Sequence, residues 1–460
     1  MKIARPISIA LLPLALSACA LAPPAKVDAP VPAQWHASLP HNGELTDLAT
    51  WWRQQGDPLL PELIAAAQAA SPTIASAGSR LAQSRAERAA ATAALLPSLD
   101  AAVSVTRANQ QSTLPGGTTS AGALQSAWEI DLFGGRRADR NAALARQAGA
   151  SALWHDARVA VAAEVANQYY ALRSCELLLA VARQDALSRA DTARLTGLTA
   201  SAGFQAPATA ALARASAAEG KSRATLQQAL CDIDVKTLVA LTAIDEPALR
   251  AKLAASTAAP PPAFAIAALP AQVLAQRPDV FNAEHEVAAA SADVGSARAA
   301  RYPRLSLQGS IGAANFRTGG ENIQTDTWSI GPLALTLPLF DAGRRSANVD
   351  AAKARYDAAV IGYRASARNA VREVEQALVN LDSSNARSSD AQVAMEGYRT
   401  AFVAAEDRYK NGMGSLLELE DARRTRLAAE NAVIALQRER SAAWVALYRA
   451  AGGGWTPSAN

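Results

Sequence analysis

Two cysteines in this 460-residue chain are spaced so that they could form a disulfide. Cys175 and Cys231 each lie 28 residues from Gly203, where a long alanine-rich helical pattern breaks and a hairpin tip is expected. Positions equidistant from the turn of an antiparallel helical hairpin lie side by side, so in an oxidising compartment we predict a Cys175–Cys231 disulfide. The alternative is two buried free thiols, because Cys175 is followed closely by the apolar run 177–179.

The third cysteine, Cys19, ends a sequence typical of a secretory signal. A basic start and an apolar stretch over 7–16 precede the tetrad Leu-Ser-Ala-Cys, which resembles a bacterial lipobox. We therefore expect a signal peptide over 1–18 and lipidation of Cys19; the alternative is ordinary cleavage that leaves the cysteine unmodified. Ala20 follows rather than Asp, and by resemblance to bacterial lipoproteins this implies the outer membrane.

The remaining reactive side chains show no spacing that suits catalysis or a metal site. The four histidines are scattered, and no Gly-x-Ser-x-Gly turn or phosphate-binding loop is present. The 45 Lys and Arg residues nearly balance the 41 Asp and Glu residues, so a nucleic-acid surface is not indicated. We predict a protein that is not an enzyme and needs no cofactor or metal.

The elements that must position these residues occur twice in the chain. Leu96-Pro97 and Tyr302-Pro303 each open an alternating run, and each run pair ends in an Arg pair that opens a long alanine-rich segment. The copies lie about 207 residues apart, which is too long for a solenoid unit and indicates a tandem duplication.

The alternating runs predict β-hairpins over about 98–133 and 303–340, because apolar residues recur at every second position. A change of phase at Gly331-Pro332 indicates a bulge. The runs reach the length of about 9–11 residues that a tilted membrane strand needs. Four strands cannot close a barrel, and lipid forbids unpaired edges, so several copies must share one barrel. The alternative is an ordinary soluble sheet.

Proline-free segments after each Arg pair predict two long helical hairpins, with tips near Gly203 and Gly412. A helix of about 60 residues is about 90 Å long, which favours a coiled coil. Charged residues recur throughout, which excludes a helical membrane span. The predicted order is a signal peptide over 1–18, a lipidated tether over 19–56, a first repeat over 57–245, a Pro-rich linker over 246–270, a second repeat over 271–455 and a tail over 456–460.

Short motifs along the whole mature chain resemble those of the TolC-like outer membrane factors, in particular their lipoprotein branch, the NodT-type efflux outer membrane subunits. These motifs are Trp51-Trp52 with Gly56-Asp57-Pro58, Arg277-Pro278-Asp279-Val280, Tyr302-Pro303, Leu339-Phe340-Asp341-Ala342-Gly343, Arg408-Tyr409 with Gly412, and the terminal Ala451-Gly452-Gly453-Gly454-Trp455.

The resemblance implies a mainly α fold with membrane β: a homotrimer whose twelve strands form an outer-membrane barrel, continued by a periplasmic α-barrel. It implies a passive exit channel for drugs or other small molecules. An inner-membrane pump would deliver them through a periplasmic adaptor protein. The alternative is a structural coiled-coil envelope lipoprotein without a transport role.

The resemblance also implies a gate at the periplasmic mouth. Aligning Tyr409 with the family's Arg-Tyr-x-x-Gly motif places Glu418 and Asp421 on its acidic positions, three residues apart on one helix face. The alternative is that these acids are favoured in a first helical turn by the helix dipole. The tips expected to dock the adaptor contain Gly203, Gly412, Met413 and Gly414.

Overall fold

The computed structural model describes residues 27–32, 35, 51–54, 57–109, 116–256, 273–274 and 277–455. The chain forms two compact units, which are described separately. The first contains residues 1–29, 78–152 and 281–366, and the second contains residues 30–77, 153–280 and 367–460. The predicted signal peptide, Cys19, most of the predicted tether and the predicted tail over 456–460 lie outside the described residues.

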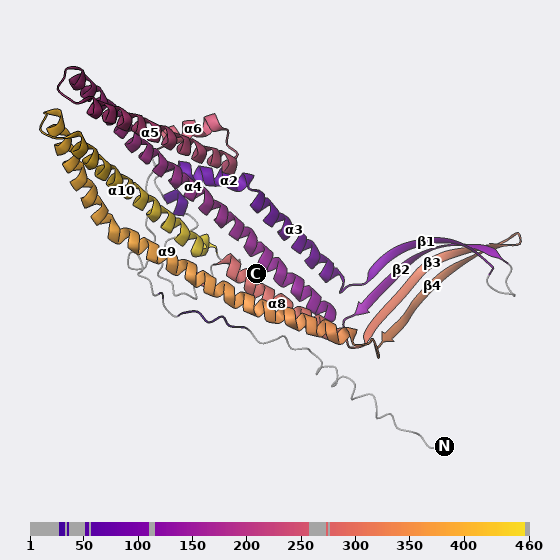
Figure 1. The fold of residues 1–460 in the computed structure, drawn as a ribbon. Coiled ribbons are helices and arrows are strands. Elements are labelled where there is room, and N and C mark those ends of the chain that lie inside the picture. Colours follow the sequence, from indigo (N-terminus) through magenta and orange to yellow (C-terminus); the bar gives the residue numbers. More distant parts are fainter. Residues whose placement is uncertain are drawn as a thin grey trace. The chain divides into compact units, whose positions relative to one another are not determined.

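A four-stranded antiparallel sheet dominates the first unit (Figure 1). Its order is β1 (Ser98–Ala108), β2 (Gly117–Ile130), β3 (Arg304–Thr318) and β4 (Glu321–Thr336). The strands β2 and β3 pair without interruption, from Thr118 opposite Arg317 to Ile130 opposite Leu305. The two hairpins predicted from the two repeats therefore form one sheet.

The alternation seen in the sequence gives this sheet two different faces. Apolar side chains from all four strands share one face, and most of them are exposed, including Val103, Ile311 and Trp328. Most residues that alternate with them, such as Gln125 and Ser310, are polar or small. An exposed apolar sheet face of this length is unusual in water and is typical of a surface covered by lipid or by protein.

The bulge predicted at Gly331-Pro332 is present. Leu307 lies opposite Leu333 and Gly309 lies opposite Ile330, so two residues of β4 face a single residue of β3. This extra residue accounts for the change of phase in the sequence, because it restores the apolar side chains to the same face beyond the bulge.

Helices flank the sheet in the sequence. They are α3 (Pro72–Ala93), α4 (Gly135–Ser201), α8 (Pro278–Ala299) and α9 (Arg344–Lys410). The two longest, α4 and α9, each have 67 residues and occupy equivalent places in the two repeats. Among the described residues, no helix is both long and apolar enough to cross a membrane.

Helices also make up the second unit. It contains α2 (Leu59–Ala70), α5 (Pro207–Thr242), α6 (Glu246–Ala255), α10 (Leu416–Ala450) and parts of α4 and α9. Its core is centred on the fully buried Trp51, Trp444 and Tyr169. Tyr169 on α4 donates a hydrogen bond to Asp57, and Asp57 also accepts one from the backbone N–H of Leu59, at 3.0 Å, at the start of α2.

The predictions of a tether over 19–56 and of a linker over 246–270 are partly wrong. The segment predicted as a linker over 246–270 begins with the helix α6. Pro247 is compatible with this helix because it lies in the first turn, where a backbone N–H would have no hydrogen-bond partner within the helix. The tether over 19–56 ends in the 3₁₀ helix η3 (Trp51–Gln54), whose Trp51 is fully buried. The predicted strands are also too long at their ends, since β2 ends at Ile130 and β4 at Thr336.

Candidate functional site

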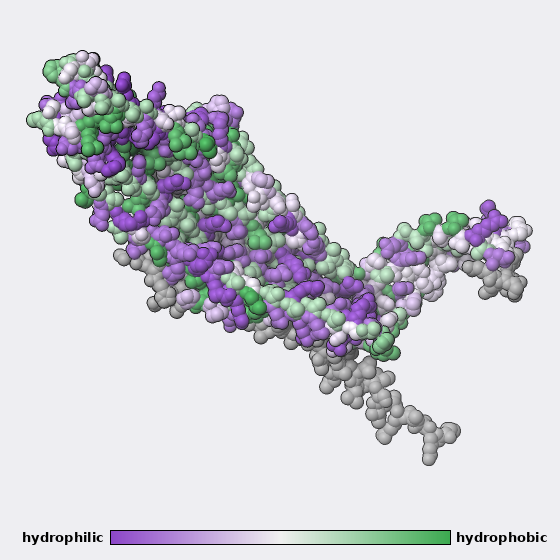
Figure 2. All heavy atoms as spheres, viewed as in Figure 1, coloured by the Kyte–Doolittle hydropathy of each residue, from purple (hydrophilic) through white to green (hydrophobic). Residues whose placement is uncertain are grey.

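The tips of the two helical hairpins lie in the second unit. Gly203 follows α4, Gly412 follows α9, and both have positive φ, at 81° and 73°. Glycine is favoured there because other residues are strained in this conformation. Phe204 and Met413 beside them are 83% and 72% exposed, and Figure 2 shows hydrophobic residues at the surface of the hairpin tips, at the upper left. Exposed apolar side chains on tight turns suit contact with another protein.

Glu418 lies in the first turn of helix α10, whose N-cap is Ser415. Its backbone N–H donates to the hydroxyl of Ser415 at 3.1 Å, and its carboxylate accepts from the backbone N–H of Ser415 at 3.2 Å. This capping box satisfies two N–H groups that otherwise lack partners at a helix start. The capping role agrees with the alternative interpretation of Glu418, although its carboxylate still carries a charge at the tip.

Asp421 lies one turn further along α10. Its carboxylate pairs with Arg424, and both side chains are largely exposed, at 59% and 78%. Tyr409, the third predicted gate residue, lies on α9, and its hydroxyl is 2.5 Å from that of Thr196 on α4. Tyr409 thus connects the two helical hairpins, whereas Asp421 faces solvent.

A cluster of buried charges near the tip was not predicted from the sequence. Four members form the tip cluster: Asp185 and Arg189 on α4, with Glu420 and Arg423 on α10. Arg189 pairs with Asp185 at 2.8 Å and with Glu420 at 2.5 Å, and Arg423 pairs with Glu420 at 2.5 Å. The cluster therefore connects the two helical hairpins by ion pairs.

Hydroxyl groups and one further arginine complete the surroundings of the tip cluster. Arg423 donates hydrogen bonds of 3.1 Å to the hydroxyls of Ser188 and Thr192 on α4. Arg223 on α5 pairs with Asp185 at 3.1 Å. Sequence offers only a weak signal for this arrangement, since i,i+3 and i,i+4 charge pairs such as Glu420–Arg423 recur on many exposed helix faces.

Burial sets the electrostatics of the tip cluster. Arg423 is fully buried, and this burial lowers the pKa of its guanidinium, while Glu420 opposes the change. The Oδ1 atom of Asp185 and the Nε atom of Arg423 have no hydrogen-bond partner within the described part of the chain. Charges buried in this way must remain paired, because an isolated one costs several kcal/mol.

A groove of about 980 Å³ opens beside the tip cluster, between α4, α9 and α10. Leu187, Leu195 and Val403 provide apolar walls, and Glu406 and Glu430 provide carboxylates. The Arg426 guanidinium lies 4.0 Å from the centroid of the Phe402 ring that forms part of the wall. The groove therefore offers both apolar surface and charge to a partner.

The structure joins the two predicted cysteines. Cys175 on α4 and Cys231 on α5 have sulfur atoms 2.14 Å apart and Cα atoms 5.5 Å apart. This places a covalent link between the two arms of the first helical hairpin, in the core of the second unit.

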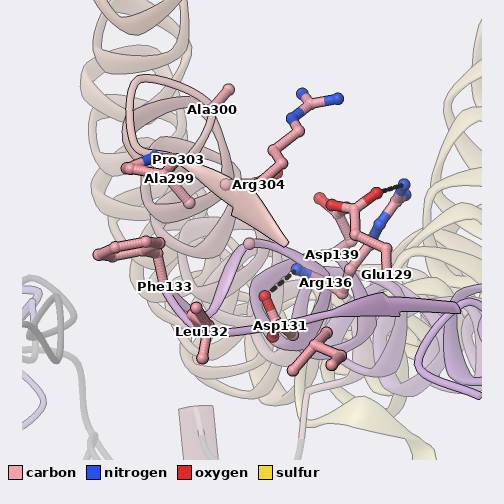
Figure 3. Close-up of a pocket in the computed structure, with 13 residues that line it drawn as sticks. Glu129, Asp131, Leu132, Phe133, Arg136, Asp139, Ala299, Ala300, Pro303 and Arg304 are labelled. Carbon is pink, nitrogen blue, oxygen red and sulfur yellow. Dashed lines mark hydrogen bonds and ion pairs between the residues drawn. The ribbon is translucent and has the colours of Figure 1, made fainter. Parts of the chain in front are cut away.

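A small pocket of about 110 Å³ lies at the base of the sheet in the first unit, where β2 continues into α4 (Figure 3). Asp131 accepts hydrogen bonds from the backbone N–H groups of Arg136 and Arg137, at 3.1 and 2.9 Å. Glu129 pairs with Arg136 at 2.9 Å. These contacts fix the start of α4 to the end of β2. No group of side chains suited to holding a metal ion occurs among the residues that the structure describes.

Comparison with known proteins identifies relatives over the whole chain. The family model described as Outer membrane efflux protein matches residues 63–243 and 269–453. Outer membrane protein OprJ of Pseudomonas aeruginosa is 31% identical over 98% of this chain and 96% of its own. The antibiotic efflux pump outer membrane protein ArpC of Pseudomonas putida is 29% identical over 98% of this chain and 95% of its own.

Solved structures show the same architecture. The outer-membrane channel OprN is 27% identical, with a TM-score of 0.83 over 95% of this chain and 98% of its own. The Campylobacter jejuni CmeC outer membrane channel superimposes with a TM-score of 0.86 over 96% of both chains, at 23% identity, and therefore supports the fold alone.

Proposed function

Because the chain belongs to the outer membrane efflux protein family, we propose that it is the exit channel of a tripartite efflux system in the outer membrane. The observation that carries this function is the full-length match to outer membrane components of efflux pumps, which covers both repeats. In this proposal the channel is a passive conduit, and the inner-membrane pump supplies the energy for transport.

Three copies form one channel in this proposal. Each copy supplies four strands, and its two outer strands, β1 and β4, have edges without a partner within the described chain. The exposed apolar face of the sheet would contact lipid. Twelve strands from three copies would leave no free edge, which is the condition for a sheet to be stable in a membrane.

The helical hairpins receive the partners. We propose that a periplasmic adaptor docks on the tips that contain Gly203, Gly412, Met413 and Gly414, and that an inner-membrane transporter delivers the substrate. The exposed Phe204 and Met413 support such contact. Relatives carry names that refer to toluene, to pyoverdine and to cations. This range favours small molecules as a class for this chain and does not select one of them.

We propose that Tyr409, Glu418 and Asp421 form the gate at the periplasmic mouth of the channel. In a trimer, Glu418 and Asp421 would place six carboxylates around one opening and attract cations. Tyr409 would hold α9 against α4 through Thr196 while the mouth is closed. Lipidation at Cys19 would add an anchor to the membrane contact of the barrel.

The test uses a bacterial strain that lacks its own outer-membrane efflux components. The full-length chain, coexpressed with an adaptor and pump of the same family of systems, should restore resistance and form trimers that resist SDS until heated. It should also form conducting channels in planar bilayers. A protein that forms neither heat-modifiable oligomers nor channels would instead support a structural envelope lipoprotein.

A further inference from the structure

The internal duplication provides a template for the contact between copies. Within one chain, β2 of the first repeat pairs with β3 of the second repeat. In a closed ring, β4 of the second repeat meets β1 of the first repeat in a neighbouring copy. If the repeats are equivalent, the seam between copies should reproduce the β2–β3 seam within the chain. This inference rests on the proposed assembly of copies into one barrel.

The turns after β2 and β4 use the same kind of helix cap, although its aspartate precedes Leu-Phe in the first repeat and follows Leu-Phe in the second. Asp131 accepts hydrogen bonds from two backbone N–H groups at the start of α4, and Asp341 accepts them from Gly343 and Arg345 at the start of α9, at 3.1 and 3.2 Å. Each aspartate also accepts from the guanidinium of an arginine, Arg137 or Arg345. Both turns share the order Leu-Phe, then glycine, then an Arg pair, so Leu132-Phe133 corresponds to Leu339-Phe340.

One aromatic contact between the two repeats has no counterpart at the equivalent positions within the described chain. The Phe133 ring stacks on the Tyr302 ring, with centroids 4.9 Å apart. Phe340, the equivalent of Phe133, is 89% exposed. The equivalent of Tyr302 is Leu96, since each precedes the proline that opens a hairpin, and Leu96 is 65% exposed. Two apolar residues are thus exposed at the two positions that a neighbouring copy would bring together.

We propose that β4 of one copy pairs with β1 of a neighbouring copy in the register of the β2–β3 seam, and that Phe340 packs on Leu96 of that neighbouring copy. The correspondence between repeats then places Leu337, Leu335 and Leu333 opposite Leu99, Ala101 and Val103. Pairing ends after Leu337, because Pro338 has no backbone N–H to donate.

This register keeps the apolar face continuous across the seam. Leu333, Leu335 and Leu337 are 50–65% exposed, and Leu99 and Val103 are 69% and 86% exposed on the matching face. A shift by one residue would place every apolar side chain of β4 beside the polar face of β1. Only shifts by an even number of residues therefore compete with the proposed register.

Barrel geometry argues against an even shift in one of the two directions. Strand pairing places Ser126 opposite Leu99, Gly309 opposite Ser126, and Ile330 opposite Gly309. The proposed seam places Ile330 opposite Val105 of the next copy. Val105 lies about six residues beyond Leu99, so the register shifts by about six residues per copy. For three copies, this register shift, a rise of about 3.3 Å per residue along a strand and a distance of about 4.8 Å between neighbouring strands give a strand tilt of about 46° from the barrel axis. Membrane barrels have about 35–45°. A seam with Leu339 opposite Leu99 would require about 54°, which lies outside this range. A seam with Leu335 opposite Leu99 would give about 35°, so the choice between it and the proposed register rests on the Phe340–Leu96 contact and on the test below.

Disulfide trapping in the assembled full-length protein tests the register. The pairs A101C/L335C and A102C/A334C lie directly opposite each other in the proposed seam, and one of them has the closer, non-hydrogen-bonded spacing. Oxidation in membranes should link copies through at least one of these pairs, as seen on non-reducing gels after heating. The matched pairs L99C/L335C and V103C/L335C share the β4 cysteine but are shifted by two residues, and they should link at least tenfold less.

Stronger linking by a shifted pair would overturn the register, as would an intact trimer that no pair links. Absence of any trimer would instead contradict the proposed assembly. Phe340→Ala and Leu96→Ala should each lower the temperature at which trimers dissociate. The double variant should lower it no further than the more damaging single change, because both remove one contact. Fully additive losses would contradict contact between the two residues.

Discussion

The carboxylate of Asp185 on α4 lies 3.8 Å from the guanidinium of Arg423 on α10, and the two side chains are 2% and 0% exposed. Buried charges of opposite sign at this distance hold two helices together only while both are present. The helical hairpins of the two repeats are thus joined near their tips by a contact that tolerates little change.

Arg423→Met should destabilise the second unit by up to about 3–5 kcal/mol, because it removes one cation from the carboxylates of Asp185 and Glu420, which keep Arg189 as a partner. Arg424→Met is the matched control: Arg424 is 78% exposed and pairs with an exposed Asp421, so its loss should cost less than about 1 kcal/mol. Denaturant unfolding of the purified proteins measures both. Equal losses for the two variants would contradict a special role for the tip cluster.

The charges proposed at the mouth can be removed without removing the helix cap. Glu418→Gln keeps a side chain that can complete the capping box, whereas Glu418→Ala should cost about 0.5–2 kcal/mol in stability. The variant with both Glu418→Gln and Asp421→Asn should show weaker cation preference and weaker block by multivalent cations in planar bilayers. Unchanged selectivity in this variant would leave Glu418 as a helix cap only.

Reduction should loosen the first helical hairpin. The Cys175–Cys231 bond closes a loop with a sequence separation of 56 residues, and such a link contributes about 2–4 kcal/mol. Cys175→Ser and Cys231→Ser should lower the Tm by similar amounts, and a reductant should lower the Tm of the native protein but not that of the variants. Peptide mapping that recovers both thiols alkylated without reduction would rule out the bond in the mature protein.

Asp156 on α4 gives the second unit a distinct pH dependence. Burial, followed by the nearby Asp279, raises the pKa of its carboxyl group. The folded state therefore binds this proton more tightly than the unfolded state, and ionisation of Asp156 costs stability above its folded pKa. Asp156→Asn should raise the Tm at pH 7.5, and the gain should shrink as the pH falls through that pKa. Asp191→Asn, at an exposed position on the same helix, provides the control. A gain independent of pH would contradict ionisation of the half-buried Asp156 carboxyl group as its cause.

Cys19→Ser tests the anchor. If Cys19 is acylated, this change should abolish lipid labelling, while a protein that is still exported and assembled should remain in the membrane through its strands. Metabolic labelling with palmitate and fractionation of the envelope measure the two effects. Full solubility of a correctly processed Cys19→Ser protein would contradict membrane-spanning strands.

The sequence by itself determined the elements and their repetition. Period-2 alternation identified the strands, because a sheet with two different faces requires it, and the change of phase at Gly331-Pro332 identified the bulge. Proline-free segments identified α4 and α9, and glycines identified the tips at Gly203 and Gly412. These features are local, so neighbouring residues along the chain are sufficient to specify them.

Tertiary structure alone decided which distant side chains meet. Asp185 and Arg423 lie 238 positions apart in the sequence, and neither belongs to a motif, so only the packing of α4 against α10 shows that both are buried. Sequence drew attention to Glu418 and Asp421 but left open which would serve as a cap, because that depends on the position of Ser415 at the start of α10. The energy of a charge depends on what excludes water from it, and that is a property of the folded neighbourhood rather than of the residue.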